Sequence, residues 1–144
     1  MLSRILSGAA MFALSAAAVA ATPAFDGKTN LLCTVQQLHE CDSFSGCAPL
    51  DSGYSAPLKH LDVDFKRGSV QLEDVKVQLS SPISNTQVVE GKLILQGTDN
   101  GLKNDTQDGA GWSMSINQRY GTMILSVAGQ DVAFVGFGAC VPNR

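Results

Sequence analysis

The sequence is poor in positive charge and in aromatic residues. Of its 144 residues, 10 are lysine or arginine, 13 are aspartate or glutamate, and only 6% are aromatic. Proteins that bind nucleic acid neutralise its phosphates with clustered lysine and arginine. The shortage of cations predicts that the protein has no basic surface and does not bind nucleic acid.

The usual sequence marks of an enzyme are also missing. Only two histidines, His39 and His60, are available as catalytic bases, and neither lies in the motif of a nucleophilic site. No phosphate-binding loop is present, and the stretch 53–57 matches only half of a nucleophile elbow. We therefore expect a non-enzymatic protein without a cofactor, with a hydrolase using His39 or His60 as a weaker alternative.

The first 20 residues have the three parts of a secretory signal peptide. Arg4 precedes an apolar run over 8–19, which ends in small residues. We expect cleavage before Ala21, with the junction before Phe25 as second choice, leaving one domain over 21–144. The protein is then periplasmic or secreted. The alanine-rich signal is more typical of bacteria than of eukaryotes, and no cysteine lies at the cleavage point to carry a lipid anchor. We expect a soluble monomer.

The chain contains four cysteines, Cys33, Cys41, Cys47 and Cys140. Exported proteins occupy oxidising compartments, so the four predict two disulfides, for which three pairings are possible. We favour Cys41 with Cys47, around a turn rich in serine and glycine, and Cys33 with Cys140, joining the first strand to the last. A zinc site of these thiolates and His39 is the alternative, although the spacing lacks the familiar C-x2-C pair.

Alternating apolar and polar residues predict the fold. The period of two is clearest over His60–Lys66, and it returns in several later segments. Further strands are expected at 70–72, 75–79, 89–96, 112–117, 123–127 and 132–140. Ser80-Ser81-Pro82 is expected to break the pattern, and Leu31–Glu40 to begin as a strand and finish as a helical turn. The prediction is an all-β domain, a small antiparallel meander barrel or sandwich of seven to eight strands.

Two aromatic residues are candidates for contact with a ligand or partner. Trp112, the sole tryptophan, begins a strand and is expected either in the core or as a stacking surface. Phe134 and Phe137 have opposite parity on the last strand, so one faces inward, and an outward Phe137 offers a contact patch.

Acidic residues give weaker candidate sites. Asp62 and Asp64 share one strand face, where they form either a cation site or a solvated charged stripe. A polar loop places Asp99, Asp105 and Asp108 near one another. Carboxylates suit calcium, but the spacing fits no EF-hand, and a solvated hairpin tip is the alternative. We expect no other metal.

Three segments resemble a small group of exported, uncharacterised bacterial proteins that end in FGAC: Leu93-Ile94-Leu95-Gln96-Gly97, Gly111-Trp112-Ser113-Met114 and Phe137-Gly138-Ala139-Cys140. The resemblance to that group implies no particular activity. The layout of signal peptide, small barrel and first-to-last-strand disulfide is more loosely similar to periplasmic lysozyme inhibitors of the membrane-associated C-type class. Ser52-Gly53-Tyr54 is similar to their serine-glycine inhibitory loop, which makes Ser52 and Tyr54 candidate contacts. This chain is longer and has two extra cysteines.

The sequence therefore favours a binding module whose partner is an unidentified envelope or extracellular protein. The alternative is a lipocalin-like carrier of a small apolar ligand, in which Trp112, Met114, Met123 and Phe134 would line an incompletely filled interior.

Overall fold

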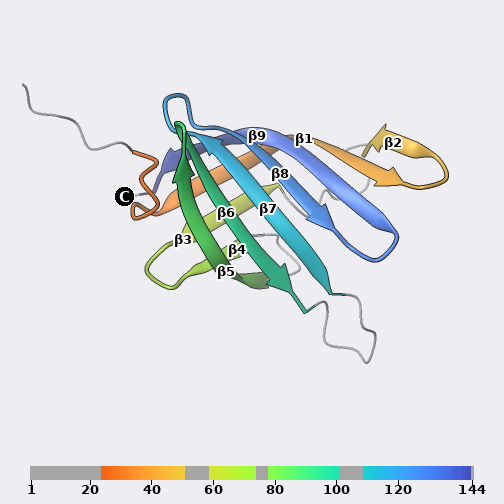
Figure 1. Ribbon diagram of the computed structural model, residues 1–144, viewed down its shortest axis with the longest axis horizontal. Helices are drawn as coiled ribbons and strands as arrows, with labels where there is room; N and C mark the ends of the chain where they lie inside the picture. Colours follow the sequence, from red (N-terminus) through yellow and green to blue (C-terminus); the bar gives the residue numbers. More distant parts are fainter. Residues whose placement is uncertain (1–23, 51–58, 74–77, 101–108, 144) are drawn as a thin grey trace, which may run out of the picture.

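A computed structural model of the chain describes residues 24–50, 59–73, 78–100 and 109–143, which form strands and turns and contain no helix. Its nine strands (Figure 1) are β1 (Leu31–Asp42), β2 (Gly46–Pro49), β3 (His60–Asp64), β4 (Ser69–Glu73), β5 (Gln78–Val89), β6 (Lys92–Asp99), β7 (Ala110–Asn117), β8 (Thr122–Ala128) and β9 (Val132–Pro142). The described residues include no helix that is long and apolar enough to cross a membrane. The expected signal peptide lies outside the described residues.

The strands form a single antiparallel sheet that closes on itself. Neighbours follow the order β1-β3-β4-β5-β6-β7-β8-β9, and β9 pairs with β1 along its whole length. Closure removes the free edges that make an open sheet prone to aggregation. The eight strands form the barrel, and β2 is a ninth strand that pairs with β1 alone. The predicted all-β barrel is confirmed, with one strand more than expected.

The period of two divides each strand between an inner and an outer face. Leu61 and Val63 of β3 are buried, while the alternating residues His60, Asp62 and Asp64 are more accessible. The inner residues of all eight barrel strands form one core. Its most deeply buried side chains are Leu31, Cys33, Val63, Leu93, Leu95, Met114 and Ile116.

Residues 24–30 cover one end of the barrel, which we call the closed end. Phe25 is buried there, and the side-chain amide of Gln118 donates a hydrogen bond to the Phe25 carbonyl. Gly121 has a φ of 71°, and a Cβ on it would stand 2.6 Å from the Phe25 ring. The turn at 118–121 therefore needs glycine both for its backbone and for space. Ala24 also packs against the core.

The prediction that Leu31–Glu40 ends in a helical turn is wrong. Strand β1 continues to Asp42, with a bulge between Val35 and Gln37. The bulge adds one residue and shifts the parity, so that Val35 and Leu38 both face the core. The three-residue spacing of these two apolar residues is typical of a helix, but here it results from the bulge.

The expected break at Ser80-Ser81-Pro82 is also wrong, because these residues lie inside β5. Pro82 pairs with Ser69 at the end of the β4 pairing, and pairing with β6 begins at Ile83. Proline cannot donate to a ladder. It is tolerated at this point because β5 changes partner there.

Both favoured disulfides are confirmed. Cys33 on β1 lies directly opposite Cys140 on β9, and this buried bond joins the two strands that close the barrel. Cys41 lies opposite Cys47 on β2. Because all four sulfurs are bonded in pairs, none is available as a thiolate for the alternative zinc site.

Candidate partner-binding site

The end of β1 and the whole of β2 form a hairpin, residues 39–49, that we call the arm. It extends beyond the barrel on the side away from the closed end (Figure 1). The β1 half of the arm pairs with β9, whereas the β2 side chains are exposed and pack little against the barrel. The Cys41–Cys47 bond, which joins residues directly opposite each other, holds the two strands together just behind the turn. A short hairpin is otherwise marginal in water, so the disulfide compensates for the missing core.

The turn at the tip of the arm is held by one carboxylate. Asp42 accepts hydrogen bonds from the backbone N–H groups of Phe44 and Ser45, at 2.7 Å each, and from the Ser45 hydroxyl. Gly46 follows with a φ of 77°. A three-residue hairpin loop followed by a left-handed glycine is a common connection, and glycine takes this conformation without strain.

The side chain at the centre of this turn is Phe44, and it is 98% exposed. Large aromatic side chains are enriched at the centres of protein interfaces, and a rigid loop loses little entropy when it binds. Our sequence predictions did not include Phe44. The available signal was a phenylalanine between two serines in the five residues that separate Cys41 from Cys47, a loop too short to have a core of its own.

The three hydrogen bonds lower the pKa of Asp42 below its ordinary value of 3.8, with the Ser45 hydroxyl making the largest contribution. A carboxyl with a lowered folded-state pKa stabilises the turn fully above its ordinary value, and this stabilisation is lost as the pH falls through the lowered pKa. We predict that the turn loosens only below about pH 4. Amide NMR shifts of Phe44 and Ser45, followed from pH 6 to 2, should show this transition.

The matched control for this titration is Asp42→Asn. In this variant the amide shifts of Phe44 and Ser45 should not change across the same acidic range. A transition that persists in Asp42→Asn would show that another group holds the turn.

A second feature is a hollow of about 480 Å³ on the outer wall of the barrel, across β6 to β9 and β1. Its lining includes exposed apolar side chains, Ile124 and Phe137, beside polar ones such as Gln37 and Asn117. Lys92 is the one charged residue of the lining. The predicted outward Phe137 is 41% exposed, while Phe134 packs partly buried against the core.

The two histidines lie at separate points of the outer wall. His39 makes an edge-to-face contact with the Phe137 ring, with 6.1 Å between centroids, so it packs beside the hollow. Nδ1 of His60 lies 3.4 Å from the Thr34 hydroxyl, in an exposed position. Each histidine therefore has a structural neighbour, and they come from different parts of the sheet.

Trp112 is placed in the core, the first of the two positions considered for it. It is 9% exposed, and its indole N–H donates to the Ser81 hydroxyl at 2.6 Å. That hydroxyl donates in turn to the Thr98 carbonyl. The indole lies across Gly97, where a Cβ would be 2.4 Å from the ring. A buried tryptophan with a satisfied N–H stabilises the barrel and leaves little ring surface for stacking.

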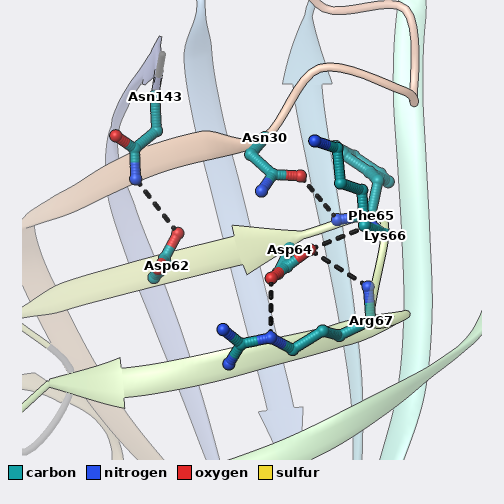
Figure 2. A network of polar contacts seen from close by, with 7 residues as sticks. All are labelled: Asn30, Asp62, Asp64, Phe65, Lys66, Arg67 and Asn143. Atoms are coloured by element: carbon teal, nitrogen blue, oxygen red, sulfur yellow. Dashed lines mark hydrogen bonds and ion pairs between the residues drawn. The ribbon is translucent and has the colours of Figure 1, made fainter.

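Asp62 and Asp64 share the outer face of β3, but they bind different partners (Figure 2). Asp64 accepts the backbone N–H groups of Lys66 and Arg67 and pairs with the Arg67 side chain at 3.2 Å. The hydrogen bond from the Arg67 N–H is the largest cause of its lowered pKa. Asp62 instead accepts from the Asn143 amide at 3.4 Å. Because Asp64 holds the turn through its hydrogen bonds, it is not free to bind a cation. This favours the solvated charged stripe over a cation site.

The other candidate residues fall mostly outside the described part of the chain. Ser52, Tyr54, Asp105 and Asp108 lie there, whereas Asp99 is the last residue of β6. Among the residues that the structure describes, no three histidine, cysteine or acidic side chains are grouped so as to hold a metal.

A scan against protein-family models found no match, and no curated protein is similar enough to be reported as a homologue.

Proposed function

We propose that the protein is a non-enzymatic binding module that acts in the periplasm or outside the cell and holds a partner protein with the tip of the arm. The observation that carries the proposal is Phe44, almost fully exposed on a turn fixed by Asp42 and the Cys41–Cys47 disulfide. Exposing a phenylalanine to water is unfavourable unless a partner covers it. A preformed tip that fills an apolar pocket gains this burial at low entropic cost.

Charge near the tip specifies the partner further. Glu40 and Asp42 lie on the arm, and Asp131 lies in the neighbouring β8–β9 turn. The segments 38–50 and 128–135 contain no lysine or arginine. Complementary charge speeds association and excludes wrong partners. A basic protein with an apolar pocket fits best, and the looser resemblance to periplasmic lysozyme inhibitors supports an inhibitory role.

The first test places a photo-crosslinking phenylalanine analogue at position 44 in the native compartment. We expect a discrete protein adduct from position 44 and none from position 120, an exposed tyrosine at the other end of the barrel. With the captured protein purified, Phe44→Ala should weaken binding about 30-fold or more, as for an interface hot spot. Tyr120→Ala is the control. A c-type lysozyme is the first purified protein to assay in parallel.

Equal binding by Phe44→Ala and the wild type would contradict the proposal. A native mass spectrum gives the outcome that would favour the carrier alternative, a retained small molecule. In the structure the four side chains proposed to line a ligand cavity, Trp112, Met114, Met123 and Phe134, pack within or against the core. If the protein had a hydrolytic activity and lost it when His39 and His60 were replaced by alanine, the hydrolase alternative would be favoured instead.

A further inference from the structure

Most positive charges of the described residues are gathered at the closed end. Strand directions bring the start of β1 and three turns, 65–68, 90–91 and 118–121, to this end. Hydrogen bonds join them: Phe65 N–H donates to the Asn30 side chain, and Gln118 N–H donates to the Gly91 carbonyl. The cations carried by these segments and by the adjoining start of β6 are all exposed; they are Lys28, Lys66, Arg67, Lys92 and Arg119. Of the cations in the described ranges, only Lys59 lies elsewhere.

The acidic residues of the closed end offset this charge only in part. Asp26 accepts the N–H groups of Lys28 and Thr29, and Asp64 holds the turn shown in Figure 2. Both side chains are half-buried, whereas Glu90 is exposed. Half-buried Asp62 lies near the same end, opposite Leu32, and Arg67 is paired with Asp64 at 3.2 Å. Five exposed cations therefore lie beside one exposed acid and three half-buried ones, which leaves a small excess of positive charge on a chain whose formal charge is −3. The expectation that the protein has no basic surface does not describe this end, because total charge says nothing about where the charges gather.

Apolar side chains are exposed among these cations. Tyr120 is 67% exposed with the Arg119 guanidinium 5.2 Å from its ring centre, and Val88 and Val89 are 52% and 45% exposed beside the β5–β6 turn. Leu32 and Val141, which pair on the outer wall near the same end, are also exposed. The combination of cations with projecting aromatic and aliphatic side chains is typical of surfaces that lie on a bilayer.

We propose that the closed end binds the surface of a bilayer containing anionic phospholipids. Cations close to such a surface are attracted to the headgroups, and tyrosine is favoured at headgroup level. A soluble polyanion would engage the cations but leave Tyr120, Val88 and Val89 in water, so the bilayer is the better fit. The acidic arm does not oppose this contact. Strand β1 has 12 residues, so the tip of the arm lies about 40 Å from the closed end and Glu40 about 30 Å, several screening lengths away at physiological salt.

The test measures co-sedimentation of the purified protein with phosphatidylcholine vesicles that contain about 30% phosphatidylglycerol, at about 0.1 M salt. We expect binding to these vesicles and none to pure phosphatidylcholine. The Lys28→Gln/Lys66→Gln variant should bind about 25-fold more weakly, about fivefold for each cation. The matched control is Lys59→Gln, which removes an exposed cation from outside the closed end and should bind like the wild type. Thermal melting checks that each variant is folded.

A second variant separates the bilayer from other anions. Tyr120→Ser should weaken vesicle binding while the charges stay in place. The proposal is overturned if the wild type does not sediment with the anionic vesicles, or if Lys59→Gln and the double variant lose binding equally. Binding to dextran sulfate as strong as to the vesicles, with Tyr120→Ser unaffected, would also overturn it and indicate a soluble polyanion.

Discussion

Replacing Cys33 and Cys140 together by alanine should lower the free energy of unfolding by about 4–5 kcal/mol. The disulfide joins residues 107 apart in sequence, and a bond that closes so long a loop restricts the unfolded chain strongly. It also lies, fully buried, between the two strands whose pairing closes the barrel. The loss is comparable to the whole stability of many small domains. Urea unfolding followed by the fluorescence of Trp112, the only tryptophan, measures it.

The control is the Cys41→Ala/Cys47→Ala variant. This disulfide spans a sequence separation of only 6 and lies on the arm, so the same model predicts a loss of about 2 kcal/mol at most. Local fraying of the arm would leave the barrel transition almost unchanged. If both variants lost the same stability, the loop length and the place in the barrel seam would not be what makes the Cys33–Cys140 bond important.

The alternation of residues predicted most of the barrel because period two reports directly which side chains are buried. In the strand at His60–Asp64, the buried Leu61 and Val63 alternate with polar neighbours as expected. Pairing of the first and last strands could be inferred as well. Cysteines near the two ends of an exported domain have few ways to pair that leave none free.

The errors arose where a strand departs from the regular ladder. The bulge at Gln36 gives β1 a spacing that resembles a helix, and β5 contains Pro82 because it changes partner there. Both depend on neighbouring strands that are distant in sequence. Local pattern alone carries no information about them.

The candidate site was harder to predict for a different reason. Exposure at Phe44 results from the arm extending past the barrel, and the basic closed end results from turns that are far apart in sequence. Composition gave a small net negative charge, which is correct for the chain as a whole. It could not show that most cations of the described residues gather at one end. Phe137 was predictable because parity on one strand decides which way it points.

The two proposals place different partners at opposite ends of one rigid barrel. A bilayer at the closed end would leave the arm, with Phe44 at its tip, directed away from the membrane (Figure 1). A protein held there meets the arm at roughly the length of β1 from the lipid surface. The proposals remain separable, because Phe44→Ala and Lys28→Gln/Lys66→Gln each affect only one of the two binding assays.

The second large effect expected in this protein is at Gly97. A Cβ there would stand 2.2 Å from the Pro82 carbonyl oxygen and 2.4 Å from the Trp112 ring, both far inside contact distance. The backbone of β5 cannot move away without breaking its pairing with β6, and the indole is held by its hydrogen bond to Ser81. Gly97→Ala should therefore lower the free energy of unfolding by about 3 kcal/mol, at the upper end for overpacked cores.

Gly111→Ala is the matched control, since Gly111 is the neighbour of Trp112 on β7 and a Cβ there meets no atom within 4 Å. Its effect should stay within about 0.5 kcal/mol of the wild type. Urea unfolding of both variants compares them directly. Wild-type stability in Gly97→Ala would mean that the indole can leave its place across β6. The hydrogen bond to Ser81 would then not fix Trp112, and the interior would have the adaptable space that the carrier alternative needs.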